Sequence, residues 1–143
     1  MCATAAGIDM VSINQMDAML EASGQPYRDM CWSRAEQAYC GASVARYAAR
    51  WAAKEAVMKA LGHGIGEVDP LDIEVVSLEG RRPELRLSGT ASAFAEQAGV
   101  SLTLSMSHEA DLATALVVAT RCCATYAPPD RCATATTSTS QAK

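Results

Sequence analysis

The stretch VARYAARWAAKEAVMKAL, residues 44–61, decides the fold of this chain. It is rich in alanine, contains neither Gly nor Pro, and is followed directly by Gly62, so it predicts one helix that ends at a glycine. At about 100° per residue, its large apolar side chains share one broad face: Tyr47, Trp51, Val57, Met58 and Leu61. Because a helix that is apolar nearly all round is normally buried, we expect this helix to be central to the fold.

Charged side chains also run along this helix. Arg46, Arg50 and Lys54 follow one another at intervals of four residues, and such like charges repel by a few tenths of a kcal/mol per pair. Glu55 and Lys59 are also four apart, in the favourable order for a surface ion pair of about 0.3–0.5 kcal/mol. Two interpretations remain open: a solvated face with an ion pair, or a positive stripe that faces an anion.

The length of 143 residues is enough for one domain with a real core. The 50% hydrophobic and 20% charged content is ordinary for a globular protein. From residue 121 onward the sequence is rich in Ala, Thr and Ser, with a Pro-Pro pair and no periodic apolar face. We therefore expect one domain over residues 1–120 and a flexible low-complexity tail over residues 121–143.

Charge and cysteine usage limit the partners and the compartment. A net charge of −4 argues against a general nucleic-acid binder, and no apolar run approaches the ~20 residues that span a bilayer. The start of the chain lacks the pattern of a secretory signal. Six cysteines show neither CxxC nor zinc-like spacing, so free thiols in a reducing cytoplasm are expected: Cys2, Cys31, Cys40, Cys122, Cys123 and Cys132.

Three shorter helices are predicted over residues 14–23, 33–40 and 90–98. Ser33 and Glu36 have the spacing of a capping box, in which each side chain bonds the backbone amide of the other residue. The first helix has weak apolar periodicity and is expected to end at Gly24. For the third, Thr90 is the candidate N-cap.

Five strands are predicted over residues 6–13, 72–79, 84–88, 101–107 and 112–120. The second and third are joined by Gly80-Arg81-Arg82-Pro83, a link that favours a hairpin. The fourth alternates apolar and polar residues like a half-buried strand, whereas the fifth is continuously apolar and is expected to lie at the centre of a sheet.

Two polar residues stand out in this apolar frame. Asp9 lies inside the first apolar strand, where an isolated buried carboxylate is costly, so it is either an edge-strand side chain that reaches water or a metal ligand. His108 lies in the expected turn between the last two strands. A lone turn histidine is more often incidental than functional.

Four stretches together resemble one family. They are GIDMVSI (7–13), RYAARWAAKEAVMKALGHGIG (46–66), GRRPELRLSG (80–89) and LSMSHEADLATALVVA (104–119). Their order and spacing are similar to those of holo-acyl-carrier-protein synthases, the short type of 4′-phosphopantetheinyl transferase. The resemblance covers roughly residues 6 to 120.

The resemblance implies an α+β single domain, with a small antiparallel sheet packed on a long central helix plus shorter helices. It implies a homotrimer with active sites between subunits. The implied reaction moves the 4′-phosphopantetheine arm of coenzyme A to a serine of an apo acyl carrier protein, releases adenosine 3′,5′-bisphosphate and depends on Mg²⁺. The carrier could belong to a fatty-acid, polyketide or peptide synthase.

The family's metal ligands correspond to Asp9 and Glu55. Mg²⁺ usually takes one or two carboxylates and completes its coordination with phosphate oxygens and water, which agrees with this pair. Lys59 matches a lysine that reaches the same phosphates, and Arg50 matches a contact for the 3′-phosphate of coenzyme A. Lys54 belongs to the same motif and is included among the coenzyme A contacts.

His108 and Ser107 match the family's turn at the coenzyme A phosphates, where the histidine binds phosphate or handles a proton. The hairpin residues Gly80, Arg82 and Pro83 resemble a loop that approaches the nucleotide from a neighbouring subunit. The implied catalytic residues are Glu55, Lys59 and His108. The base that takes the serine proton stays open among a metal-bound water, Glu55 and His108.

One position departs from the family. Members commonly carry a basic residue just after the first strand, on the helix that docks the acidic carrier, but this chain has Asn14 there, followed by Asp17 and Glu21. Fewer positive charges should slow the encounter with an acidic carrier. Two rival hypotheses remain: a non-catalytic module that binds coenzyme A or a carrier, and a structural domain in which Glu55 and Lys59 merely pair.

Overall fold

The computed structural model describes residues 2–121, and the predicted tail from residue 122 onward lies outside them. The element order is β1 (Cys2–Ser12), α1 (Ile13–Cys31), α2 (Arg34–Cys40), α3 (Val44–Leu61), η1 (Pro70–Asp72), β2 (Ile73–Val76), β3 (Glu84–Leu87), α4 (Gly89–Ala98), β4 (Ser101–Glu109) and β5 (Leu112–Arg121). Among these elements no helix has both the length and the hydropathy that crossing a bilayer requires. Arg121, assigned to the tail, is the last residue of β5.

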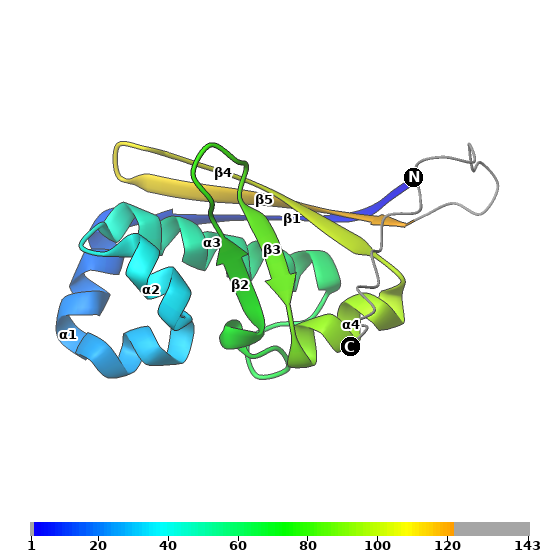
Figure 1. Ribbon diagram of the computed structural model, residues 1–143, viewed down its shortest axis with the longest axis horizontal. Helices are drawn as coiled ribbons and strands as arrows, with labels where there is room; N and C mark the ends of the chain where they lie inside the picture. The colour runs from blue at the N-terminus through cyan, green and yellow to red at the C-terminus, as the bar shows by residue number, and fades with distance from the viewer. Residues whose placement is uncertain (1, 122–143) are drawn as a thin grey trace, which may run out of the picture.

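The strands form two antiparallel sheets rather than one. β5 is the centre of a three-stranded sheet in the order β1-β5-β4, as its apolar run predicts, and β2 pairs with β3 in a separate hairpin. Figure 1 shows α3 running along one face of the three-stranded sheet, with the β2–β3 hairpin on another side of the helix. The α+β architecture is confirmed, with α3 as its central element.

Small residues bring β1 against α3. Gly7 is buried, and a Cβ at this position would lie 2.8 Å from the amide nitrogen of Ala60 and closer still to the carbonyl oxygen of Ala56. Only glycine therefore fits where the strand crosses the helix. Side chains two residues apart share one face of a strand, so Asp9 is also directed toward α3.

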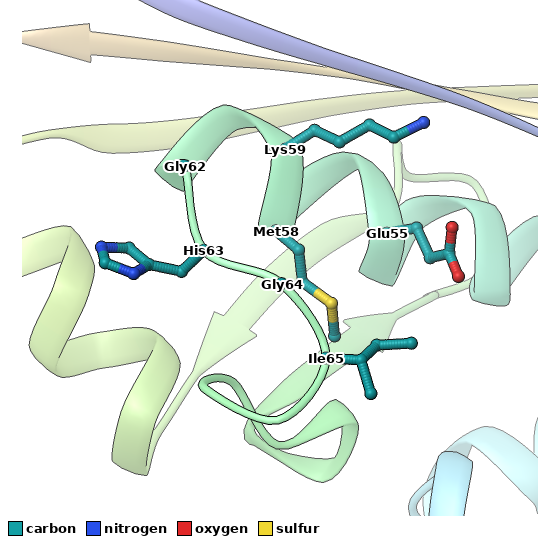
Figure 2. Close-up of a pocket in the computed structure, with 7 residues that line it drawn as sticks. All are labelled: Glu55, Met58, Lys59, Gly62, His63, Gly64 and Ile65. Carbon is teal, nitrogen blue, oxygen red and sulfur yellow. The ribbon is translucent and has the colours of Figure 1, made fainter.

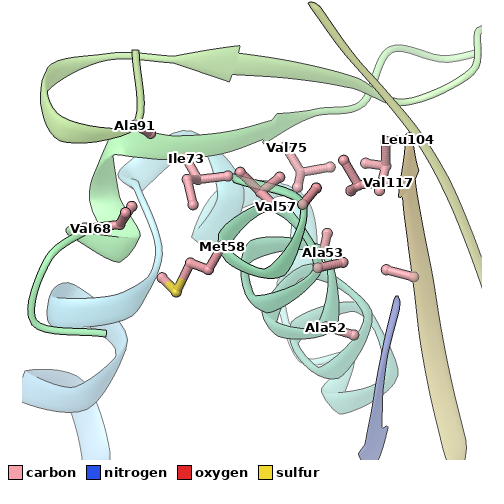
Figure 3. Close-up of a cluster of buried hydrophobic side chains, with 13 residues drawn as sticks. Ala52, Ala53, Val57, Met58, Val68, Ile73, Val75, Ala91, Leu104 and Val117 are labelled. Atoms are coloured by element: carbon pink, nitrogen blue, oxygen red, sulfur yellow. The ribbon is translucent and has the colours of Figure 1, made fainter. Parts of the chain in front are cut away.

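The main core surrounds the alanine-rich side of α3. Ala52, Ala53 and Val57 are fully buried, and Figure 3 shows them between side chains of the hairpin and of the sheet. The short alanine side chains allow both layers to approach the helix closely. The buried residues of this cluster are Ala52, Ala53, Ala56, Val57, Met58, Ala60, Val68, Ile73, Val75, Ala91, Leu104, Ala115 and Val117.

A second core packs the corner between α1 and α2 onto α3. Its centre is Trp32, which is 1% exposed. The indole makes edge contacts with Tyr27 and Tyr47, at centroid distances of 5.4 and 5.1 Å, and a tilted contact with Trp51 at 5.9 Å. Such aromatic pairs stabilise by about 0.5–1.5 kcal/mol beyond their buried area. These contacts fix α1 and α2 beside the start of α3.

The helix α1 is longer than predicted. Its first segment ends where expected, because Gly24 has the non-helical angles φ 62° and ψ −149°. A second helical segment then begins around Pro26 and continues to Cys31. Proline is well tolerated in the first turn of a helix, so it starts a helix here rather than ending one.

Two local predictions are wrong at the ends of elements. The N-cap of α4 is Ser88 rather than Thr90, whose amide and hydroxyl both donate to Asp72 Oδ2 at 2.7 Å. His108 lies within β4, because this strand continues to Glu109 and the turn follows at Ala110, where φ is 50°. The capping box of Ser33 and Glu36 is confirmed.

The cysteines differ in state. Cys31 and Cys40 are free and buried, as predicted, and burial raises the pKa of the Cys40 thiol to about 11. A thiol with so high a pKa stays protonated at neutral pH and is unreactive. Cys2 is disulfide-bonded, which contradicts the expectation of free thiols. The other three cysteines lie outside the described residues.

Candidate functional site

Asp9 and Lys59 form an ion pair where β1 crosses α3. Lys59 Nζ donates to Asp9 Oδ1 at 2.7 Å and to the carbonyl oxygen of Ile8 at 3.0 Å. The Asp9 side chain is 11% exposed, whereas that of Lys59 is 54% exposed. The hydrogen bond to Asp9 raises the pKa of Lys59. Asp9 is therefore a mostly buried carboxylate with a charged partner. That partner, Lys59, comes from α3, whereas Asp9 belongs to β1.

Glu55 shares the negative charge of this site. Burial raises the pKa of its carboxyl group first, and the carboxylate of Asp9 raises it further, while Lys59 opposes the shift. The raised pKa of Glu55 shows that Lys59 does not fully offset the burial of Glu55 and the neighbouring carboxylate. A divalent cation would offset them further, so the electrostatics fit a metal ion.

The number and type of ligands indicate which metal fits. Among residues 2–121 no group of three or more His, Cys, Asp or Glu side chains could hold an ion. Mg²⁺ needs only one or two carboxylates when substrate phosphates and water complete its coordination. A pair such as Asp9 and Glu55 therefore fits Mg²⁺ better than a structural zinc ion, which takes four protein ligands.

Two hollows meet at Glu55. One, of about 410 Å³, is lined by Met58, Lys59 and the loop from Gly62 to Ile65. The other, of about 270 Å³, is lined by Asp9, Trp51, and Met16 and Met19 of α1. Figure 2 shows Lys59 extending from α3 toward β1, whereas His63 points away.

His63 is engaged outside the carboxylate pair. Its ring stacks on Phe94 at a centroid distance of 3.6 Å, and its Nδ1 lies 3.2 Å from Glu67 Oε1. These contacts hold the glycine-rich loop after α3 against α4. His63 therefore shapes the wall of the larger hollow without facing Asp9.

A separate basic hollow of about 350 Å³ collects other predicted residues. Arg50, Pro83, Ser107 and His108 all line it. Arg50 is only 2% exposed; its Nη2 donates to Ser77 Oγ at 2.6 Å, and its Nε has no partner among the described residues. Sequence reasoning missed four polar residues that complete this lining: Tyr39, Arg46, Ser77 and Arg81. The charge stripe on the helix pointed to Arg46 and the predicted hairpin loop contains Arg81, but nothing in the sequence pointed to Tyr39 or Ser77.

The hairpin loop contributes a different arginine from the one predicted. Gly80 has a left-handed φ of 72°, and the next residue, Arg81, lines the basic hollow. Arg82 instead lines another hollow between β3 and β4, together with Pro83. Within one chain, Arg81 and not Arg82 therefore lies in the hollow of Arg50 and His108, and the role of Arg82 at coenzyme A stays a prediction. In an irregular loop the sequence does not show which of two adjacent side chains faces a site.

Lys54 is a structural residue, and its assignment as a coenzyme A contact is wrong. Its side chain is 0% exposed, and Nζ donates to Glu36 Oε2 and to the carbonyl oxygen of Pro70, each at 2.9 Å, and to that of Ile73. All three of its protons are used, so none remains for a ligand. Burial lowers the pKa of Lys54, and the Glu36 carboxylate opposes this shift.

The two groups of predicted residues remain apart within one chain. The hollows around Glu55 have no lining residue in common with the hollow of Arg50 and His108. Glu55 follows Arg50 by five residues on α3, which at about 100° per residue directs the two side chains roughly 140° apart. The sequence motif therefore combines residues that the fold separates.

Comparison with known proteins points to one family. Residues 5–117 match the family model of the 4′-phosphopantetheinyl transferase superfamily. A holo-[acyl-carrier-protein] synthase of Gloeobacter violaceus is 41% identical over 116 residues, which cover 78% of this chain and 88% of that protein.

Two solved structures are also similar. The holo-[acyl-carrier-protein] synthase of Neisseria meningitidis has a TM-score of 0.76 and 32% identity, over 84% of this chain and 100% of that one. The Helicobacter pylori holo-[acyl-carrier-protein] synthase in complex with coenzyme A has a TM-score of 0.73 and 31% identity, over 80% of this chain and 99% of that one.

Proposed function

Because this chain belongs to the 4′-phosphopantetheinyl transferase superfamily, we propose that it transfers the 4′-phosphopantetheine arm of coenzyme A to a serine of an apo acyl carrier protein. The other product is adenosine 3′,5′-bisphosphate. The observation that carries the proposal is the pair of carboxylates, Asp9 and Glu55, beside Lys59 on a surface with open hollows. The proposed location is the cytoplasm.

Asp9 and Glu55 would hold Mg²⁺. When bound, the ion would neutralise negative charge on the pyrophosphate of coenzyme A. Lys59 lies one turn beyond Glu55, and its 54% exposed side chain can reach the same phosphates. Phosphoryl transfer depends mainly on positioning and on stabilising negative charge, so a lysine and two metal-holding carboxylates are a sufficient set.

In the proposed step, the serine oxygen of the carrier forms a bond to the phosphorus that bears pantetheine. The bond from that phosphorus to the oxygen of adenosine 3′,5′-bisphosphate breaks, and the serine proton passes to a base. Glu55 is in the same hollow as Asp9, whereas His108 lies in the basic hollow of the chain. This placement favours Glu55 over His108 as the base within one chain.

We propose that the complete site forms between subunits of a homotrimer. The pyrophosphate and the 3′-phosphate of coenzyme A are attached to one ribose, yet the carboxylates and Arg50 face different sides of α3 within a chain. A neighbouring copy could supply the basic hollow. Arg50, Arg81, Ser107 and His108 of that copy would then hold the 3′-phosphate.

The outer face of the three-stranded sheet supports such an assembly. Ile8 and Met10 of β1 are 60% and 66% exposed, and Leu112 and Leu116 of β5 are 51% and 42% exposed. Ile8 is the direct partner of Leu116 in the β1–β5 register. A contiguous exposed apolar patch of this kind typically marks a protein interface.

The activity is tested by incubating an apo acyl carrier protein with coenzyme A, Mg²⁺ and this protein, followed by mass spectrometry of the carrier. We expect the carrier to gain the mass of the phosphopantetheine arm, and Asp9→Ala to abolish the gain without loss of the fold. A rise in melting temperature with coenzyme A but no mass gain would indicate a non-catalytic binding module. Neither effect would indicate a purely structural domain.

A further inference from the structure

Tyr39, at the end of α2, contacts two of the three arginines that line the basic hollow, Arg46 and Arg50. It is 43% exposed, although an aromatic ring of this size is usually more buried. The Cζ of Arg50 lies 4.3 Å from the centroid of its ring, and the Cζ of Arg46 lies 4.8 Å from it. Both distances are within the range of about 6 Å over which an aromatic ring attracts a cation.

Hydrogen bonds also hold Arg46 and Arg50 beside the Tyr39 ring. Arg46 Nη1 donates to the carbonyl oxygen of Tyr39 at 3.0 Å, so Arg46 is held by the ring and by the end of α2. Arg50 is held by the ring and by Ser77 Oγ at 2.6 Å. Arg46 and Arg50 are one helical turn apart and repel each other. The negative face of the Tyr39 ring offsets part of that repulsion.

We propose that Tyr39 is a positioning residue that holds Arg46 and Arg50 ready for the 3′-phosphate of coenzyme A. The inference rests on the proposed function, in which Arg50 binds that phosphate. Guanidinium groups that are already ordered lose less conformational freedom when a phosphate binds. Arginine also offers several N–H donors in a fixed plane, so an ordered pair can contact more than one phosphate oxygen.

The test compares coenzyme A with dephospho-coenzyme A, which lacks the 3′-phosphate. Each cation–ring contact corresponds to roughly a two- to fivefold change in an equilibrium constant. Tyr39→Ala should therefore raise the KM for coenzyme A by about four- to twentyfold. Its kcat, and its KM for dephospho-coenzyme A, should stay within about twofold of the original values, because neither depends on the 3′-phosphate. Tyr39→Phe, which keeps the ring, should behave like the unchanged protein.

Controls separate positioning from damage to the fold. Tyr39→Leu keeps apolar bulk without an aromatic face and should match Tyr39→Ala. Arg34→Ala removes an exposed charge from the same helix α2, outside the basic hollow, and should leave both KM values unchanged. Melting curves of all variants show whether each is folded.

The outcomes distinguish this inference from the function on which it rests. If Arg50→Ala raises the KM for coenzyme A selectively but Tyr39→Ala does not, the inference about Tyr39 is overturned and the phosphate site stands. Equal increases in KM for both substrates in Tyr39→Ala would also overturn it. If Arg50→Ala leaves the preference for coenzyme A over dephospho-coenzyme A unchanged, both the phosphate assignment and the inference are wrong.

Discussion

Gly7 of β1 lies so close to Ala56 of α3 that no side chain fits between the strand and the helix. A Cβ on Gly7 would meet the carbonyl oxygen of Ala56 and the amide nitrogen of Ala60. This contact sets the distance between β1 and α3. It thereby places Asp9, two residues further along the strand, within 2.7 Å of Lys59.

Gly7→Ala should destabilise the fold and reduce transfer together. The obstacle is helix backbone, which cannot move aside like a flexible side chain, so we expect a loss of about 2–3 kcal/mol in the free energy of unfolding. Denaturant unfolding measures this loss. Gly64→Ala is the matched control, because a Cβ there would have nothing within 4 Å. Equal stability of the two variants would contradict the close approach.

Glu55→Gln should stabilise the metal-free protein at neutral pH. Because the folded state raises the pKa of Glu55 above its ordinary value of 4.5, the folded state binds this proton more tightly than the unfolded state does. Ionisation at higher pH therefore weakens the fold. The stability gain of the variant should be full above the folded pKa and should vanish as the pH falls below about 4.5.

Unfolding curves recorded in a chelator at several pH values check this prediction. A stability difference between the two proteins that does not change with pH would contradict the environment described for Glu55. Asp9→Asn provides a second check. It should lower the pKa of Glu55, as followed by NMR titration, because the neighbouring negative charge is removed.

Lys54→Met should cost about 3–5 kcal/mol of stability, because it leaves the Glu36 carboxylate buried without its positive partner. Adding Glu36→Gln should restore part of the loss. The affinity of the folded variant for coenzyme A should not change, since Lys54 has no exposed atom. If the variant instead lost affinity for coenzyme A and kept its stability, Lys54 would be a coenzyme A contact after all.

How far the sequence predicts this molecule is clearest on α3. Its bounds, Val44–Leu61, follow from alanine content and Gly62, since local propensity and the helix cap agree there. The four-residue interval between Arg50 and Lys54 does not show which of the two is enclosed, because burial depends on the elements that pack around each side chain. Arg50 faces a hollow, whereas Glu36 and the start of β2 enclose Lys54.

The sequence predicts only part of the candidate site, because the direction of a side chain depends on how the elements pack. The family motifs identify Asp9 and Glu55, and the structure brings both to one hollow. Tyr39 was not predicted because it lies at the end of a helix. Arg81 could not be distinguished from Arg82, because no periodic pattern shows which way a side chain points in an irregular loop. Only the packing of α2 and the hairpin against α3 brings them to Arg50.

The exposed face of α1 bears on the choice of carrier. Asn14, Asp17 and Glu21 are all exposed there, and the helix borders the hollow that contains Asp9. Asp17→Arg should therefore raise kcat/KM for an acidic carrier by roughly two- to fivefold at low salt, and the gain should shrink as salt is added. Glu96→Arg on α4 makes the same charge change elsewhere. An equal gain in that control would exclude a local effect.

The central claim is that one active site combines the carboxylates of one copy with the basic hollow of another. We expect Glu55→Gln to be nearly inactive when it is assembled alone. Arg50→Gln alone should also be nearly inactive at a coenzyme A concentration far below its raised KM, which is the condition for the assay. In mixed assemblies of the two variants, some interfaces pair an intact Glu55 with an intact Arg50. For random mixing in a closed ring, about a quarter of the sites are restored. Transfer activity of the mixture should thus rise to about a quarter of that of the unchanged protein; activity that stays at the level of the separate variants would contradict a site shared between subunits.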